Sequence, residues 1–477
     1  MNNMTLNKTK IIATLGPSST GQPMLKSLME EGVNVFRINF SHANHGEVKK
    51  TVLNIREISS LLGLHVSVLG DLQGPKIRLG TVKENVFIEN GDTVSITTSE
   101  VEFGDSSLVS INYLGFPKDV AKGEKILVDD GKIILKIIET NKKDLVKAEV
   151  VQGGELKSRK GVNLPNTKIS LPALTQKDRT DALFAIKNNF DWLALSFVTS
   201  KEDVYSLEEL IKQNSENKIP IIAKIEKPEA IKNLDAILQA ADGLMVARGD
   251  LGLEIPAEEV PLNQKLMVNM AKKARKPIII ATQMMESMID SLTPSRAEVN
   301  DVANSVMDGA DAVMLSGETS VGQYPVQVIQ TISKIIKGVE NSPLIKVPNT
   351  LPEIHSKRVI TKAICFQACN IANELKASAI CTLTNSGYTA WQISSWRPSA
   401  MILVFTSNKR ILSQLGLLWG VSCVFYDNFV STDRTVEEVN ELAVKKGFVK
   451  KGGLVINLAA MPVIDKGQVN TLRISRL

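Results

Sequence analysis

Several features that mark special classes of protein are missing from this sequence. Only four of its 477 residues are cysteine, and no two of them form a CxxC pair. A disulfide framework is therefore not expected, and a reducing compartment, the cytoplasm, is predicted. No apolar run reaches the length of a membrane span, and the N-terminal MNNMTLNKTK lacks the apolar core of a signal peptide. No membrane association is expected.

Other missing features exclude particular partners and kinds of active site. The net charge of +5 is spread over the whole chain without a block of Lys or Arg, so no nucleic-acid partner is expected. The Walker A, GxGxxG and HExxH motifs are all absent. The histidines do not cluster at ligand spacing, which argues against a histidine-based zinc hydrolase; they are His42, His45, His65 and His355.

What the chain does contain is a regular alternation of strand and helix patterns. Eight short apolar runs, each followed by polar or glycine-rich residues, begin near Lys10, Val33, His65, Asp191, Ile219, Gly243, Pro277 and Asp311. Helical patterns lie between most of them, such as 22–31, 48–62, 201–213, 263–275 and 296–307. Eight such units predict an α/β protein with a (β/α)8 TIM barrel, whose active site lies at the carboxyl ends of the strands.

Two parts of the chain do not follow this alternation of strands and helices. After the third run, about a hundred residues carry little helical signal and indicate strands, with hairpin turns expected at Asp130-Gly131 and Gly153-Gly154. After a linker near 348–352, the alternation restarts as an open α/β domain. The predicted domains are 1–74 with 171–345 (barrel), 75–170 (an inserted β-barrel lid that overhangs the active face) and 346–477 (C-terminal domain).

Candidate catalytic and metal-binding side chains are most closely spaced between residues 218 and 252. Lys224 and Glu226 lie two residues apart in a predicted strand, so both side chains point to the same side. The next strand ends at Arg248-Gly249-Asp250. Two carboxylates and a lysine on one rim suit Mg²⁺ bound together with a phosphate. The alternative is that Lys224 and Glu226 form only a structural ion pair.

More polar residues are expected on the same rim. They are Thr14, Arg37, Asn39, Ser41, His42, Asp71, Lys76, Arg78, Thr282, Gln283, Ser316 and Glu318. Such a cavity suits a phosphorylated, anionic substrate held through a metal. Alternatives without a role in catalysis exist for several residues: a structural salt bridge for Arg37, helix capping for Thr282 and Ser316, and a solvated loop position for Lys160.

Long motifs follow one another in a fixed order along the whole chain. They are TKIIATLGPSS (9–19), NVFRINFSH (34–42), GDLQGPKIR (70–78), KGVNLP (160–165), IAKIEKPEA (222–230), MVARGDLGLEI (245–255), ATQMMESM (281–288) and the segment 294–320. This set resembles pyruvate kinase from end to end. The resemblance implies transfer of a phosphoryl group from phosphoenolpyruvate to ADP, giving pyruvate and ATP in the last step of glycolysis. It also implies Mg²⁺, with Mn²⁺ as an alternative, and a homotetramer.

The resemblance assigns roles to individual residues. The catalytic residues would be Lys224, Thr282 and Arg37, with Lys224 stabilising the moving phosphoryl group. Phosphoenolpyruvate would be bound by Arg37, Lys224, Gly249, Asp250 and Thr282, and Mg²⁺ by Glu226 and Asp250. ADP or ATP would be bound by Arg78, Lys160 and His42.

The monovalent-cation pocket of the family is only partly matched. Asn39, Ser41, Asp71 and Leu72 match the pocket, but Lys76 stands where many members have glutamate. This combination resembles the K⁺-independent bacterial members, in which a tethered ammonium takes the place of K⁺. A K⁺ requirement is therefore not expected. The alternative is that Lys76 points into solvent.

The effector loop of the C-terminal domain also departs from the pattern. Thr384, Ser386, Gly387 and Thr389 match it, but the neutral Tyr388 stands where a cation is common. A phosphorylated effector is therefore expected to bind weakly or with a changed preference, and the DLQGPK segment resembles that of forms activated by sugar monophosphates or AMP.

Two other functions remain open at this stage. A non-catalytic or regulatory pyruvate kinase-like protein would be expected to lack Lys224, Glu226 or Asp250, and all three are present. Another TIM-barrel enzyme acting on phosphoenolpyruvate or pyruvate would lack Lys160 and the full run of motifs.

Overall fold

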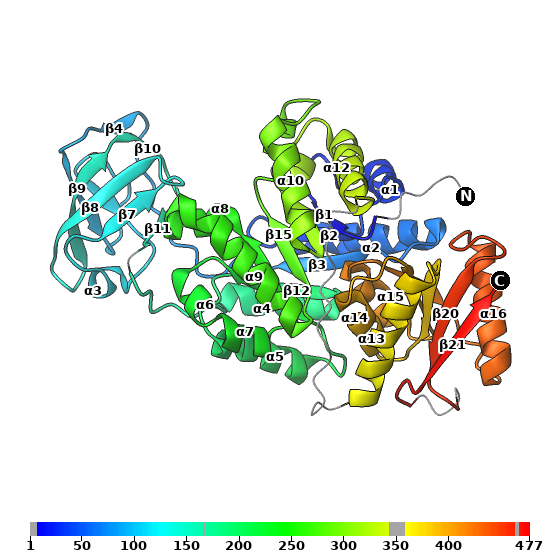
Figure 1. The fold of residues 1–477 in the computed structure, drawn as a ribbon. Helices are drawn as coiled ribbons and strands as arrows, with labels where there is room; N and C mark the ends of the chain where they lie inside the picture. The colour runs from blue at the N-terminus through cyan, green and yellow to red at the C-terminus, as the bar shows by residue number, and fades with distance from the viewer. Residues whose placement is uncertain (1–6, 166, 343–357, 463–466) are drawn as a thin grey trace.

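A closed barrel of eight parallel strands forms the centre of the molecule (Figure 1). The computed structural model describes residues 7–165, 167–342, 358–462 and 467–477. The barrel strands are β1 (Lys10–Thr14), β2 (Val35–Asn39), β3 (Ser67–Asp71), β12 (Trp192–Leu195), β13 (Ile221–Ile225), β14 (Gly243–Ala247), β15 (Ile278–Ala281) and β16 (Ala312–Leu315). Their order around the barrel is β1-β16-β15-β14-β13-β12-β3-β2. The predicted (β/α)8 barrel is confirmed.

Helices cover the outside of the barrel and bury the outer faces of its strands. They are α1 (Gln22–Glu30), α2 (His45–Leu62), α4 (Gln176–Lys187), α5 (Lys201–Asn214), α6 (Pro228–Lys232), α7 (Leu234–Ala240), α8 (Arg248–Glu254), α9 (Val260–Ala274), α10 (Arg296–Asp308), α11 (Gly317–Ser320) and α12 (Pro325–Glu340). Because side chains of these strands are buried on both faces, the strands appear in the sequence as continuous apolar runs.

The insertion between β3 and β12 forms the lid, and this name is used below for the whole insertion. Its strands are β4 (Val86–Ile88), β5 (Thr93–Thr97), β6 (Leu108–Ser110), β7 (Lys125–Val128), β8 (Ile133–Thr140), β9 (Leu145–Gln152), β10 (Gly154–Leu156) and β11 (Val162–Asn163), with a short helix α3 (Phe116–Asp119). They form a six-stranded sheet, β11-β7-β8-β9-β5-β6, and a separate pair, β10-β4. The two ends of the larger sheet are joined by a short stretch, because Arg78 forms a β-bridge with Gly161, beside β11, and Leu79 with Ile111, beside β6. This arrangement is compatible with the predicted β-barrel, which stays a prediction.

One of the two predicted hairpin turns is present. β7 and β8 pair in antiparallel fashion around Asp130-Gly131, where both residues have positive φ angles. The prediction for Gly153-Gly154 was wrong: β9 pairs with β5 and β8, whereas β10 pairs with β4. The two glycines therefore lie where the chain leaves one sheet for another.

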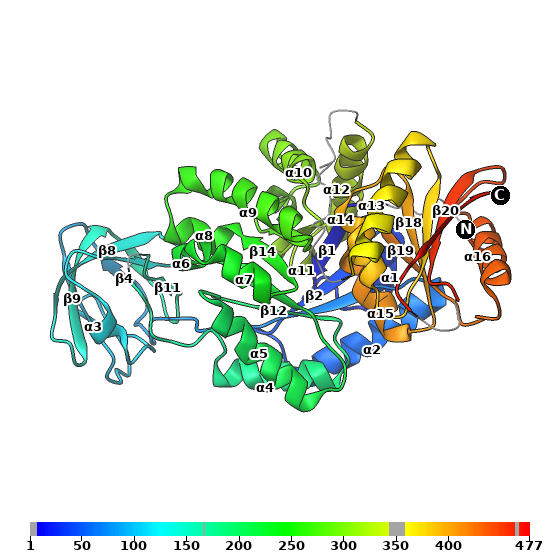
Figure 2. The same cartoon turned by 60° about the horizontal axis from the view of Figure 1, so that its bottom comes forward.

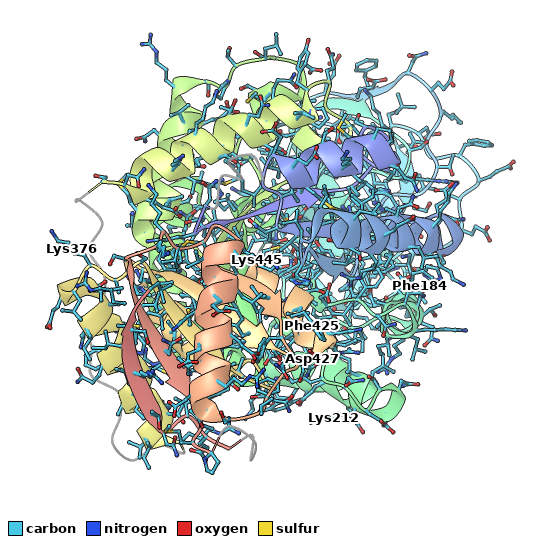
Figure 3. The ribbon with its side chains drawn as sticks, turned by 90° about the vertical axis from the view of Figure 1, so that its right-hand side faces the viewer. Phe184, Lys212, Lys376, Phe425, Asp427 and Lys445 are labelled. Carbon is cyan, nitrogen blue, oxygen red and sulfur yellow. The ribbon has the colours of Figure 1, made fainter. Side chains whose placement is uncertain are left out.

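A second α/β unit lies at the opposite end of the barrel from the lid in both views (Figures 1 and 2). Its sheet has the order β19-β18-β17-β20-β21, and only β21 is antiparallel. The strands are β17 (Ala379–Leu383), β18 (Met401–Thr406), β19 (Val421–Phe425), β20 (Leu454–Ala459) and β21 (Thr471–Arg476). The helices are α13 (Val359–Glu374), α14 (Tyr388–Ser395), α15 (Lys409–Gln414) and α16 (Thr432–Lys445). Figure 3 views this end, with Lys445 labelled on α16. The predicted linker at 348–352 lies outside the described residues.

The C-terminal unit packs against the amino ends of the barrel strands. Trp192 Nε1 donates a hydrogen bond of 2.9 Å to the carbonyl of Gln414, and Arg397 forms a 2.9 Å ion pair with Asp311. The carboxyl ends of the strands, where polar residues follow the apolar runs, are left facing the lid. Among the described helices, none combines the length and hydrophobicity needed to cross a membrane.

Candidate active site

Lys224 lies at the centre of a charged cluster at the carboxyl ends of β3, β12 and β13. Its Nζ lies 2.9 Å from Glu226 Oε1 and 3.2 Å from Asp71 Oδ1, and it donates a 2.7 Å hydrogen bond to Ser196 Oγ. The side chain of Lys224 is 11% exposed and both carboxylates are 1% exposed. One ammonium is therefore held by three partners and is largely shielded from solvent.

Charges in this cluster support one another. Burial opposes the charge of Lys224, but Asp71, Glu226 and Asp250 together raise its pKa above the usual range. Burial likewise opposes ionisation of Asp71, yet Lys224 and Arg37 lower its pKa overall. At neutral pH the site therefore presents a fixed cation that needs no proton transfer to become charged.

Arg37 adds a second cation from β2. Its Nε donates to Asp71 Oδ2 at 2.7 Å, and its Nη1 donates to Thr14 Oγ1 at 3.0 Å. The salt bridge expected as an alternative for Arg37 is thus present, and it lies within the site rather than apart from it. Asp71 consequently orients both cations on this side of the rim.

Glu226 and Asp250 form a pair of carboxylates suited to a hard divalent cation. Burial and the charge of Asp250 raise the pKa of Glu226. Glu226 Oε2 accepts the backbone N–H of Phe197 at 2.7 Å, which fixes the carboxylate in place. Among the described residues, no group of three His, Cys, Asp or Glu side chains could hold a metal. Mg²⁺ takes only one or two protein carboxylates, so this pair fits it, with substrate oxygens completing its shell.

Thr282 links the ends of β14 and β15. Its Oγ1 accepts the N–H of Gly249 at 2.8 Å, in the first turn of α8, so the capping role considered from the sequence is present. Thr282 adopts a positive φ of 67°. Arg248 braces this conformation, because its guanidinium binds both oxygens of Asp301 and donates to the carbonyl of Thr282. The strained turn sets the hydroxyl toward α8.

Of the rim residues that follow β16, Glu318 accepts hydrogen bonds from backbone N–H groups. Glu318 is 2% exposed, and its carboxylate accepts the N–H groups of Met285 at 3.1 Å and Ser316 at 2.7 Å. The Ser316 side chain makes no capping bond to α11, so the capping role considered for it was wrong. These bonds join the loops after β15 and β16.

The three nucleotide candidates come from both sides of the cleft. His42 lies on the barrel rim, and burial together with the charges of Lys76, Arg78 and Arg37 lowers its pKa. On the lid, Arg78 Nη1 donates to the carbonyl of Arg159 at 2.9 Å. Lys160 Nζ lies 2.8 Å from Asp129 Oδ1, also on the lid.

Residues of the predicted cation pocket lie next to one another at the ends of β2 and β3. Asn39 stands opposite Asp71 in the strand register, and its Oδ1 accepts the N–H of Ser41 at 3.1 Å. The Leu72 side chain is buried in the barrel core, so only its carbonyl faces this region, where it accepts Ser196 Oγ at 2.6 Å. Lys76 borders a cavity of about 410 Å³ between lid and barrel, together with Asp250.

Ser196 was missed by the sequence interpretation. It follows β12 at the end of the run WLALSF, the same position from which residues of the other strands were collected. A rule that every barrel strand contributes its next polar residue would have found it.

The effector-loop residues line a second cavity, of about 350 Å³, in the C-terminal unit. The Gly387 N–H donates to Thr384 Oγ1 at 3.0 Å, which shapes the loop. The guanidinium of Arg358 lies 4.6 Å from the ring centroid of Tyr388. A cation is therefore present beside this loop, although it comes from the residue that precedes α13 rather than from the loop itself.

Comparisons with known proteins cover nearly the entire chain. The family model "Pyruvate kinase, barrel domain" matches residues 6–329, and "Pyruvate kinase, alpha/beta domain" matches 362–475. The chain is 42% identical over 469 residues to a pyruvate kinase of Geobacillus stearothermophilus, covering 98% of this chain and 80% of that protein. It is 41% identical over 471 residues to that of Corynebacterium glutamicum, covering 98% of both.

A solved structure of a member of this family has a similar fold. The crystal structure of a pyruvate kinase from Cryptosporidium parvum is similar to this chain with a TM-score of 0.92 and 34% sequence identity. The similarity covers 100% of this chain and 97% of that one.

Proposed function

The chain belongs to the pyruvate kinase family, and we propose that the cluster around Lys224 is the centre at which it transfers the phosphoryl group. The protein is an enzyme, a kinase of glycolysis that acts on phosphoenolpyruvate and ADP. The observation that carries the assignment is the single ammonium held by Asp71, Glu226 and Ser196 on the barrel rim. A charge fixed before the reaction needs no reorganisation when the phosphoryl group moves.

The remaining groups would orient phosphoenolpyruvate for an in-line transfer. Arg37 and Lys224 would neutralise its phosphate, while Thr282 and the backbone of Gly249 and Asp250 would hold the other end of the molecule. The Thr282–Gly249 hydrogen bond supports this, because it fixes the mutual position of the two strand ends. Positioning and charge neutralisation are the main needs of phosphoryl transfer.

Pyruvate kinases use Mg²⁺, and in this chain Glu226 and Asp250 would hold it, with Mn²⁺ as a substitute. The bound ion would neutralise charge on the phosphoryl oxygens. The chain's own contribution is the buried position of Glu226, which accepts a backbone N–H, and the place of Asp250 at the start of α8.

For the nucleotide we propose Arg78, Lys160 and His42. The effect of Lys76 and Arg78 on the pKa of His42 supports a common, positively charged surface on this side of the cleft. Lys160 would exchange or share its partner Asp129 when a nucleotide phosphate arrives. Lys76 would serve as the tethered replacement for K⁺ beside Asn39, Ser41 and Asp71, so that the enzyme works without a monovalent cation.

We also propose a regulatory site and an organisation for the enzyme. The cavity around Tyr388 would bind a phosphorylated effector, with Arg358 supplying the cation. We further propose a cytoplasmic homotetramer without nucleic-acid or membrane partners. Its domains would be 1–74 with 171–345, 75–170 and 346–477; the boundary at 345 lies outside the described residues.

A coupled assay tests the proposal as a whole. Purified protein supplied with phosphoenolpyruvate, ADP and Mg²⁺ is expected to form pyruvate, and to stop when Mg²⁺ is removed by chelation. A folded protein that forms no pyruvate would instead favour a non-catalytic, regulatory member of the family.

A further inference from the structure

One buried carboxylate joins the lid to the barrel. Glu254 is the last residue of α8, and its Oε1 lies 2.8 Å from Lys227 Nζ while accepting a 3.0 Å hydrogen bond from Asn163 Nδ2. Lys227 stands at the barrel rim just before α6, and Asn163 ends β11 of the lid. β11 and α8 lie side by side in Figures 1 and 2.

This contact is more deeply buried than an ordinary surface ion pair. The side chain of Lys227 is 8% exposed and that of Glu254 1% exposed. The attraction within such a pair roughly offsets the cost of removing both charges from water, so stability alone does not account for it. Within the described part of the chain, the buried Glu254 Oε2 has no hydrogen-bond partner, so this carboxylate is held through Oε1 alone.

Both ends of the contact carry groups assigned to the reaction. On the lid, Asn163 lies three residues after Lys160, and Arg78 forms a β-bridge with the same segment. On the barrel, Asp250 lies one helical turn before Glu254 on α8. A bond between Asn163 and Glu254 therefore sets the distance from the lid cations to the metal-binding rim.

We propose that Asn163, Glu254 and Lys227 are positioning residues that dock the lid on the barrel and thereby set the affinity for ADP. Lys227 orients the Glu254 carboxylate, and Asn163 on the lid donates a hydrogen bond to that carboxylate. The groups proposed for phosphoenolpyruvate all belong to the barrel, so a lid that comes undocked does not carry any of them away. The effect on ADP rests on the nucleotide roles proposed above for Arg78 and Lys160.

Steady-state kinetics of the full-length enzyme test the effect on ADP. Asn163→Ala is expected to raise the KM for ADP about tenfold, because a hydrogen bond to a charged group is lost. The KM for phosphoenolpyruvate should change less than twofold. Asn163→Asp sets a second carboxylate against Glu254 and should raise the KM for ADP further.

Asn90→Ala is the matched control. Asn90 Oδ1 accepts the N–H of Gly153 at 2.8 Å entirely within the lid, so its loss should leave both KM values unchanged. A purely structural role for Asn163 would lower the melting temperature without separating the two KM values. Asn163→Ala and Glu254→Gln should also be non-additive in the double variant, since they remove one shared contact. Additive effects, or equal changes in both KM values, would overturn the proposal.

Amide hydrogen exchange separates docking from nucleotide binding. Residues 160–165 should exchange faster in Asn163→Ala than in the wild type or in Asn90→Ala. Unchanged exchange would refute the docking contact itself. Faster exchange with a normal KM for ADP would uphold docking but refute its effect on ADP. The nucleotide role of the lid cations is tested separately by Arg78→Ala and Lys160→Ala, which should raise the KM for ADP if that role is correct.

Discussion

Asp71 Oδ1 lies 3.2 Å from Lys224 Nζ, while Oδ2 of the same carboxylate binds Arg37. One aspartate therefore orients the two cations proposed to receive the substrate phosphate. It also raises the pKa of Lys224, with the help of Glu226 and Asp250. The site is built as a connected set of charges, and a change to one member is expected to be felt by the others.

Loss of either proposed metal ligand should change the Mg²⁺ requirement, whereas loss of a nearby carboxylate should not. Glu226→Gln and Asp250→Asn keep the side-chain shape but remove the negative charge that Mg²⁺ needs, so the Mg²⁺ concentration for half-maximal activity should rise about tenfold or more. Glu229→Gln, on the same cavity, is the control and should leave it unchanged. Titration of activity against Mg²⁺ measures this, and an unaltered requirement in both variants would rule them out as ligands.

Activity should not depend on K⁺. In tetramethylammonium buffer, added KCl should change turnover less than twofold, because Lys76 brings a tethered charge that loses no translational entropy from solution. Lys76→Glu should lower activity and make part of it recoverable by KCl. Lys168→Glu makes the same charge change on the same cavity and should gain no K⁺ response. Stimulation of the wild type by orders of magnitude would refute the idea.

Effector preference should differ from that of members with a cation in the loop. Phosphoenolpyruvate saturation curves should respond more to ribose 5-phosphate, glucose 6-phosphate or AMP than to fructose 1,6-bisphosphate, because the neutral Tyr388 cannot pair with a second phosphate. Arg358→Ala should weaken the response about tenfold. Lys409→Ala is the control, since Lys409 lies over Phe425. Strong activation by the bisphosphate alone would contradict this account.

Lys10, at the junction between the barrel and the C-terminal unit, should make the protein more stable as the pH rises. Lys10 Nζ donates to the carbonyl of Val421 at 2.8 Å, and burial lowers the pKa of Lys10 from 10.5 to about 8. The unfolded chain therefore binds this proton more tightly, so stability should rise by about 2 kcal/mol from pH 8 to pH 10. Urea unfolding of the wild type and Lys10→Met at both pH values isolates this contribution. Identical pH dependence in the two proteins would count against it.

Much of the barrel was predictable because its information is local. Strands buried on both faces appear as apolar runs, and the two-residue period of a strand places Lys224 and Glu226 on one side. Both features follow from neighbouring residues in the sequence. The eight barrel strands were found for this reason.

What the sequence could not show depends on distant partners. Gly153-Gly154 has the composition of a hairpin turn, but β10 pairs with β4, more than sixty residues earlier. Three features depend in the same way on long-range packing: the bridges that join the two ends of the lid sheet, the Lys160–Asp129 pair and the contact of Asn163 with Glu254. Residue type alone does not select among such partners.

The turnover of Lys224→Ala tests the central claim most directly. Loss of the fixed positive charge should lower kcat at least about 100-fold. It also leaves Asp71 and Glu226 without their shared cation, so stability should fall by about 3–5 kcal/mol, and circular dichroism must show that the assayed protein is folded. A folded variant with kcat reduced at least 100-fold is the predicted result; a folded variant with near-normal kcat would contradict the role of Lys224.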